Sequence, residues 1–232
     1  MTLTVHTDLI QGSDEWLTAR RGIVTASVVG QLVTAKTIRP AVNDYSRALT
    51  TLLVSERITG WTEPVYVSDA MMRGSDDEPI ARDAYARHMD VDVTVPGFMV
   101  REFGGRAQGD PDYMIGYSPD GLVGDDGLIE IKSRAPKKHL ATILAGVAPA
   151  ENMAQMQAGL LVSGRAWCDY VSFCGGMPLW TCRVLPDPRW FAAITEAVAT
   201  FEATAVEMVA TYRSATAGLP MTERTTYQEV SF

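Results

Sequence analysis

The sequence has few cysteines, no long apolar run and no excess of positive charge, and each shortage excludes a class of protein. Its three cysteines, Cys168, Cys174 and Cys182, are an odd number without a CxxC pair. We therefore expect neither a disulfide framework nor a zinc site, and we predict a reducing compartment. No apolar run reaches about 18 residues, so no membrane span is expected. The first residues do not resemble a secretory signal either.

The charge of the chain is negative and unevenly distributed. The 20 Lys and Arg against 28 Asp and Glu give a formal charge of −8, which argues against a protein that coats DNA nonspecifically. Residues 61–130 hold 5 basic and 15 acidic side chains, whereas residues 131–165, directly after them, hold 5 basic and 1 acidic. An acidic stretch followed by a basic one suggests a local function for each.

Hydrophobic spacing predicts an α+β fold, in which helices, a central mixed β-sheet and further helices follow one another along the chain. Residues 118–132 are expected to form a hairpin with Gly124-Asp125-Asp126-Gly127 as its turn. No shift in composition separates two domains. The predicted helices cover 13–20, 25–33, 41–58, 68–88, 136–145, 149–163 and 190–212, and the predicted strands cover 91–100, 113–117, 166–174 and 178–185.

The predicted hairpin brings charged side chains to one end of the sheet. Alternate residues of a strand share a face, so Glu130 and Lys132 point the same way and Ile131 points the other way. With the turn centred near 125–126, cross-strand partners have numbers that sum to about 250–251. Asp120 therefore lies opposite Glu130 to within one residue.

Two carboxylates beside a lysine suit metal-assisted phosphodiester hydrolysis. Carboxylate oxygens hold Mg²⁺, which keeps several waters and accepts phosphate oxygens as further ligands. The metal polarises the phosphate and acidifies a bound water, and a lysine orients or deprotonates that water. The same sequence is also compatible with a solvated hairpin whose charges face outward.

Further acidic side chains near this hairpin have two interpretations each. Glu78 lies on a predicted helix one turn after Gly74, which would allow a substrate or metal to approach closely. Alternatively, Glu78 belongs to a solvated acidic run with Asp76 and Asp77. Asp110, upstream of the hairpin, is either a group near the metal or a turn residue.

Four motifs follow one another along the chain: QGSDEWLTARRGIVTAS (11–27), RGSDDEPIARDAY (73–85), SPDGLVGDDGLIEIKS (118–133) and NMAQMQAGLLVSGRAWCDYVSF (152–173). In this order they resemble the motifs of the lambda exonuclease / YqaJ-like viral recombinase family, whose members have the PD-(D/E)XK, restriction-endonuclease-like fold. The resemblance implies an α/β/α-like core in which helices flank the sheet, and a single nuclease domain over 1–232, with a motif-bearing core at about 11–185 and a C-terminal helix at about 190–212.

The resemblance implies two groups of site residues. The first holds two Mg²⁺ ions per site, with Mn²⁺ able to substitute, and uses Lys132 to activate water; its ligands would be Glu78, Asp120, Glu130 and the backbone carbonyl of Ile131. The second group would bind a terminal 5′-phosphate, and it comprises Arg20, Ser27, Ser118 and Gln155, with Gln157 as an alternative to Gln155. Trp16 is either a core aromatic or a residue near the DNA entrance, and Asp110 aligns with a position where the family can carry an additional acid.

The function implied is a Mg²⁺-dependent 5′→3′ exonuclease that degrades one strand of linear double-stranded DNA from a 5′-phosphorylated end. It would leave 3′ overhangs for a single-strand annealing protein, in the cytoplasm of a bacterial or phage-infected cell. The resemblance also implies a homo-oligomeric ring, with a trimer favoured. Lys132, Arg134, Lys137, Lys138 and Arg165, the basic stretch, would lie along the DNA path.

Two other functions remain open from the sequence. One is an endonuclease of the same fold, of restriction type or structure-specific. The other is a catalytically inactive module that binds DNA ends. A CRISPR-adaptation exonuclease with an iron–sulfur cluster is set aside, because such a cluster needs four cysteines and the chain has three.

Overall fold

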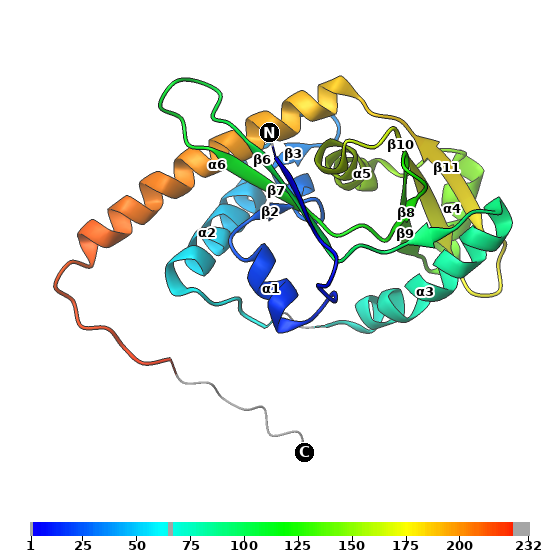
Figure 1. Ribbon diagram of the computed structural model, residues 1–232, viewed down its shortest axis with the longest axis horizontal. Coiled ribbons are helices and arrows are strands. Elements are labelled where there is room, and N and C mark those ends of the chain that lie inside the picture. Colours follow the sequence, from blue (N-terminus) through cyan, green and yellow to red (C-terminus); the bar gives the residue numbers. More distant parts are fainter. Residues whose placement is uncertain (1, 65–66, 225–232) are drawn as a thin grey trace, which may run out of the picture.

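The strands of the protein form two main sheets in the computed structural model, which describes residues 2–64 and 67–224 (Figure 1). The five-stranded sheet has the order β11-β10-β9-β8-β5. Strands β9 and β10 are parallel and the other pairs are antiparallel, so the sheet is mixed. Its strands are β5 (Val93–Thr94), β8 (Gly121–Val123), β9 (Gly127–Ser133), β10 (Trp167–Phe173) and β11 (Trp180–Val184).

The second main sheet has four strands in the order β1-β6-β7-β2. Because β7 ends at Tyr117 and β8 begins at Gly121, the short segment between them carries the chain from one sheet to the other. A separate pair joins β3 (Val33–Thr34) to β4 (Arg39–Pro40). The strands of the four-stranded sheet are β1 (Leu3–His6), β6 (Phe98–Phe103), β7 (Tyr113–Tyr117) and β2 (Val24–Thr25).

Polar side chains cap several of the helices at their first turns. The hydroxyl of Ser13 accepts a hydrogen bond from the backbone N–H of Trp16, and Asn43 and Ser46 cap each other reciprocally, which satisfies N–H groups that the helix leaves free. Ser68 has the same role at the third helix. The helices are α1 (Asp14–Arg20), α2 (Asp44–Thr59), α3 (Asp69–Met89), α4 (Pro136–Ala145), α5 (Ala150–Ser163), α6 (Pro188–Ala215) and a 3-10 turn at Val29–Gln31.

Helices cover both faces of the five-stranded sheet (Figure 1). Ile129 and Ile131 pack with Tyr85 of α3 on one face. Leu128 and Tyr170 face the core that α5 shares with the four-stranded sheet. Residues 127–131 of β9 are all buried, so the solvated interpretation of the hairpin is wrong.

The predicted fold class and the predicted hairpin register are confirmed. Gly121 pairs with Ile129 and Val123 with Gly127, so the partners sum to 250 as expected. The alternation of faces along β9 also holds, but both of its faces lie in the interior.

Two predicted elements are wrong. The predicted helix 25–33 is instead β2, a 3-10 turn and β3, because Val24 and Thr25 extend in parallel beside β7. The predicted strand 91–100 is broken into β5 and β6 around Gly97. A side chain at Gly97 would lie 2.0 Å from the carbonyl oxygen of Leu9, so the chain crosses another segment there too closely for a regular strand.

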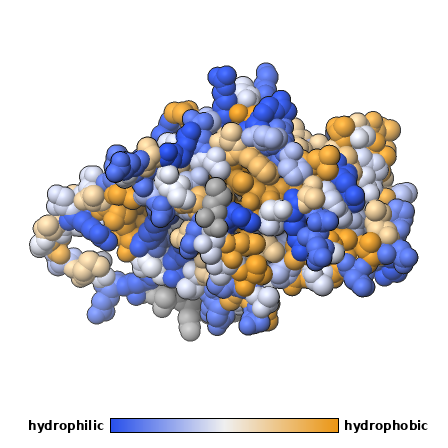
Figure 2. All heavy atoms as spheres, turned by 45° about the horizontal axis from the view of Figure 1, so that its top comes forward, coloured by the Kyte–Doolittle hydropathy of each residue, from blue (hydrophilic) through white to orange (hydrophobic). Residues whose placement is uncertain are grey.

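The outer surface is mixed in character. The face shown in Figure 2 carries hydrophobic side chains as separate patches between hydrophilic ones. Within residues 2–64 and 67–224, no helix has both the length and the apolar character that crossing a bilayer requires.

Substitution of Gly159 tests the contact between α5 and β7. A Cβ at Gly159 would approach the ring of Tyr117 to 2.8 Å. Although alanine is the better helix former by about 1 kcal/mol, we expect Gly159→Ala to lower the free energy of unfolding by about 1–3 kcal/mol through overpacking. Urea unfolding would measure it. Gly175→Ala, where a Cβ meets nothing within 4 Å, is the control, and a Gly159→Ala variant as stable as wild type would contradict the contact.

Candidate active site

A cavity of about 430 Å³ lies at the junction of the two sheets, next to α1 and the first half of α3. Members of both predicted groups of site residues line it. Glu130 does not line the cavity, but it is buried and bonds to the lining residue Lys132. The predicted residues that line the cavity are Trp16, Arg20, Ser27, Glu78, Ser118, Asp120, Ile131, Lys132 and Gln155.

Two carboxylates are held at the end of β9. Asp120 Oδ2 accepts a hydrogen bond from the backbone N–H of Ile131 at 2.7 Å. Glu130 is fully buried, and its Oε1 accepts from Lys132 Nζ at 2.5 Å. Its Oε2 is buried and has no hydrogen-bond partner within the described chain. An orphaned buried carboxylate oxygen is unfavourable, and a divalent cation beside Asp120 would satisfy it.

Glu78 projects toward this pair from α3, but it is held by an arginine. Arg82, one turn further along α3, forms an ion pair with Glu78, and its Nε donates to the backbone oxygen of Asp120 at 2.7 Å. No group of three His, Cys, Asp or Glu side chains with metal-holding geometry occurs in the parts of the chain that the structure describes. The fit to a cation therefore rests on Asp120, Glu130 and the Ile131 carbonyl.

The electrostatics of the site favour a cation. Burial and the neighbouring Glu130 raise the pKa of Asp120 well above its usual range. Burial also raises the pKa of Glu78, against the influence of Arg82. Burial lowers the pKa of Lys132, but Glu130 and Asp120 outweigh this and the net pKa is raised. Lys132 is therefore cationic here. A divalent ion would stabilise the charged forms of Asp120 and Glu78.

The second group has the side-chain chemistry that suits an anion. The guanidinium of Arg20 lies 4.0 Å from the centroid of the Trp16 ring, and its Nη2 donates to Ser27 Oγ at 3.3 Å. Trp16 Nε1 donates to Ser118 Oγ at 2.9 Å, and Gln155 Oε1 accepts from Lys132 Nζ at 3.2 Å. One guanidinium, two hydroxyls and an amide are suited to binding phosphate.

Two residues of the site, Thr25 and Arg82, are not among those predicted from the sequence. Thr25 lines the cavity and accepts from Arg20 Nη2 at 3.2 Å, and its place in the motif that also contains Ser27 was the available signal. Arg82 follows Glu78 by four residues, the spacing that brings opposite charges together on a helix, and this signal was not used.

Three predicted residues have other roles in the structure. Gln157 is buried, with its Nε2 bonded to the carbonyl of Leu185 at 2.8 Å and its Oε1 to the N–H of Asp187 at 2.9 Å, so it does not reach the cavity. Asp110 is exposed and accepts from the N–H of Ala107 at 2.8 Å, as a turn residue would. Arg165 donates to the hairpin carbonyls of Gly124 and Gly127.

This core, with Asp120 at the start of a hairpin and Glu130-Ile131-Lys132 on its second strand, is that of a PD-(D/E)XK nuclease. The profile of the YqaJ-like viral recombinase domain matches residues 15–166, which is more than half of the chain. The chain belongs to this family.

Solved structures support the same assignment. An alkaline exonuclease from Laribacter hongkongensis, LHK-Exo, is 32% identical with a TM-score of 0.75, and the match covers 90% of this chain and 100% of the other. Its complex with dAMP is 32% identical with a TM-score of 0.74, over the same shares of the two chains. A phage-related exonuclease from Haemophilus somnus 129PT shares the fold at 11% identity, with a TM-score of 0.58 over 82% of this chain and 96% of its own. No curated protein matches significantly.

Loss of a single carboxylate should remove cation binding. We expect Asp120→Asn to abolish the heat of Mg²⁺ binding in titration calorimetry, because the cation would lose one of its two anionic ligands. Asp110→Asn is the matched control and should bind as the wild type does. Unchanged binding by Asp120→Asn would remove Asp120 from the ligand set.

The raised pKa of Asp120 predicts how stability depends on pH without divalent ions. A folded-state pKa above the unfolded value gives stability that is complete below about pH 4 and is lost as the pH rises through the folded pKa. In EDTA, the Tm of Asp120→Asn should therefore rise relative to wild type between about pH 5 and about pH 8. Asp125→Asn, in the exposed turn, is the matched control for the loss of a carboxylate. A constant difference for Asp120→Asn would contradict the prediction.

Proposed function

We propose that this chain is a Mg²⁺-dependent 5′→3′ exonuclease that degrades one strand of linear double-stranded DNA from a 5′-phosphorylated end and leaves a 3′ overhang. The coarser activity, DNA exonuclease and hence hydrolase, follows from membership of the YqaJ-like family and from the exonuclease relative at 32% identity. The finer proposal rests on one observation: Asp120, Glu78 and Lys132 line the same cavity as the arginine–hydroxyl–amide group.

The second group would determine where cleavage starts. Arg20 and the hydroxyls of Ser27 and Ser118 are hydrogen-bond donors for a terminal phosphate, and Gln155 adds its amide N–H groups. Since these side chains share the cavity with Asp120 and Lys132, a bound terminal phosphate places the following phosphodiester beside the acidic group. This accounts for both the end requirement and the 5′→3′ direction.

The carboxylate–lysine group would carry out hydrolysis. We assign Asp120, Glu130 and the carbonyl of Ile131 as ligands for Mg²⁺, or for Mn²⁺ in its place, and Glu78 to a second ion. A bound cation supplies Lewis-acid polarisation of the phosphate and a more acidic bound water. Lys132, which holds its proton between Glu130 and Gln155, offsets the negative charge that develops on the phosphate.

The biological setting is part of the proposal. The family membership supports a cytoplasmic role in recombination, in which the 3′ overhang passes to a single-strand annealing protein. We also propose a single nuclease domain over 1–232 that assembles into a ring, with a trimer favoured. A sizing measurement that finds a monomer at working concentration would exclude the ring.

Digestion of an end-labelled duplex tests the activity. We expect release of mononucleotides from the 5′ end of one strand, faster with a 5′-phosphate than with a 5′-hydroxyl, and none in EDTA. Lys132→Ala should retain the fold by circular dichroism and lose cleavage by at least about 100-fold, the scale of removing one electrostatic donor that faces the developing negative charge.

A covalently closed circle of the same sequence is the matched substrate. If the circle is cut as fast as the linear duplex, the protein is an endonuclease. If wild type binds duplex ends but cuts neither substrate in Mg²⁺ or Mn²⁺, it is a binding module.

A further inference from the structure

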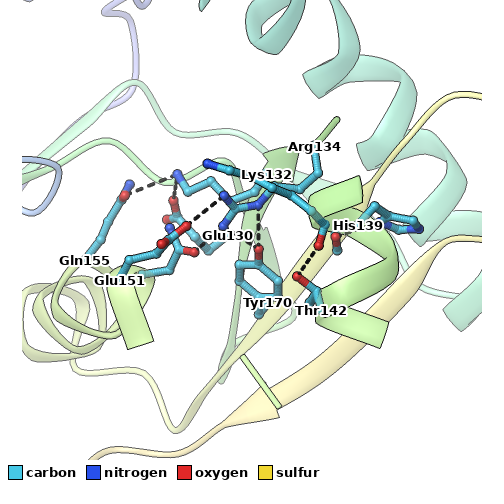
Figure 3. A network of polar contacts seen from close by, with 11 residues as sticks. Glu130, Lys132, Arg134, His139, Thr142, Glu151, Gln155 and Tyr170 are labelled. Carbon is cyan, nitrogen blue, oxygen red and sulfur yellow. Dashed lines mark hydrogen bonds and ion pairs between the residues drawn. The ribbon is translucent and has the colours of Figure 1, made fainter. Parts of the chain in front are cut away.

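Arg134 is nearly buried beside the site, although it does not line the cavity. Its side chain is 10% exposed. Its Nε and Nη2 donate to the hydroxyl of Tyr170 at 3.1 and 2.9 Å, and its Nη1 donates to Glu151 Oε1 at 2.9 Å. A further bond joins Nη2 to Asn152 Oδ1. One guanidinium therefore ties the end of β9 to β10 and to the first turn of α5 (Figure 3).

The first turn of α5 depends on this contact. The residue that precedes the helix is Pro149, and within the described chain no side chain caps it through a hydrogen bond. Glu151 and Asn152 stand four and three residues before Gln155, so all three lie on neighbouring positions of one helix face. A shift or rotation of the first turn therefore moves Gln155.

Gln155 in turn meets the strand from which Arg134 comes. Its Oε1 accepts from Lys132 Nζ at 3.2 Å, and Lys132 precedes Arg134 by two residues. Tyr170, which Arg134 contacts, pairs in register with Glu130 and is fully buried. Arg134, which follows β9, therefore bonds to the first turn of α5, and Gln155 of α5 bonds back to Lys132 of β9.

We propose that Arg134 is a positioning residue that fixes α5 against β9, and so sets Gln155 relative to Lys132 and the bound terminal phosphate. The proposal rests on the proposed function to the extent that Gln155 binds the 5′-phosphate. Arg134 acts through Gln155 and contacts no substrate. The sequence suggested that this basic side chain lies along the DNA path, but its guanidinium bonds to groups of the protein itself.

Lysine cannot replace arginine in this role. The guanidinium reaches three partners in different directions with a planar fork, whereas an ammonium on a flexible stem is a point charge. Arg134→Lys therefore retains the charge and loses the geometry. Arg183→Lys is the matched control, because Arg183 also forms a fork, to the buried Asp169 at 2.8 and 2.9 Å, and within the described residues it makes no hydrogen bond to α5.

The first experiment observes Gln155 directly and needs no activity. In ¹H–¹⁵N spectra of the full chain, the Gln155 side-chain amide is assigned by its disappearance in Gln155→Ala. We expect this signal to shift in Arg134→Lys and to stay in place in Arg183→Lys. Glu151→Ala, which removes one contact at an exposed position, should shift the signal in the same direction by a smaller amount. This variant replaces Arg134→Lys in the experiment if Arg134→Lys does not fold. An unmoved signal in the folded variants would overturn the proposal.

The second experiment measures coupling through cleavage of linear duplexes with 5′-phosphate or 5′-hydroxyl ends. Arg134→Lys should lower the preference for the phosphate by about tenfold, since small misplacements in a site have large effects, and Arg183→Lys should leave it intact. In the Gln155→Ala background, Arg134→Lys should cost no more than about twofold further.

The two experiments separate the proposals. Full additivity of the two substitutions would overturn the role of Arg134. A wild-type enzyme without phosphate preference would overturn the proposed function, while the amide signal would still decide whether Arg134 positions Gln155.

Discussion

The burial of two carboxylates together is the constraint on which the site depends. Asp120 and Glu130 lie at one end of the five-stranded sheet, and Glu130 is fully buried. Placing like charges together away from water is unfavourable unless cations and hydrogen bonds compensate. Here Lys132 and the N–H of Ile131 compensate in part, and one oxygen of Glu130 is still unpaired within the described residues. The arrangement is poised for a divalent ion, which would remove the remaining cost.

The covering helices follow from this requirement. Burial of Glu130 needs a second layer on its face of the sheet, and α5 supplies it together with Gln155. The opposite face needs α3, which also carries Glu78 and the Arg82 that holds the Asp120 backbone. The crossing from β7 to β8 then brings Ser118 to α1 and Asp120 to β9. The same short segment therefore serves both groups of the cavity, which explains why they share it.

The sequence predicts those parts of the site whose geometry depends on neighbouring residues alone. The hairpin register, and with it the meeting of Asp120 and Glu130, follows from a turn and a two-residue period. Gln155 and Gln157 could not be separated in this way, because residues two apart on a helix point about 200° apart and only packing decides which face is buried. The predicted helix 25–33 is wrong because its first residues pair with β7, which is distant in the sequence. The role of Arg134 was equally hidden, since its partners lie 17 to 36 positions away.

The negative net charge is compatible with a DNA substrate once the cations at and next to the cavity are placed. Of the basic stretch, Arg134 and Arg165 bond to protein groups, and Lys132 faces the acidic pair. Positive charge at the cavity therefore comes chiefly from Arg20, in the arginine–hydroxyl–amide group, and from Lys132, in the carboxylate–lysine group. Because electrostatic affinity for DNA scales with the number of phosphates neutralised, these two cations alone add little general affinity for a duplex. Under the proposed function, recognition would depend on a terminal phosphate meeting a preorganised set of donors, which would let an acidic protein act on DNA ends without coating the duplex.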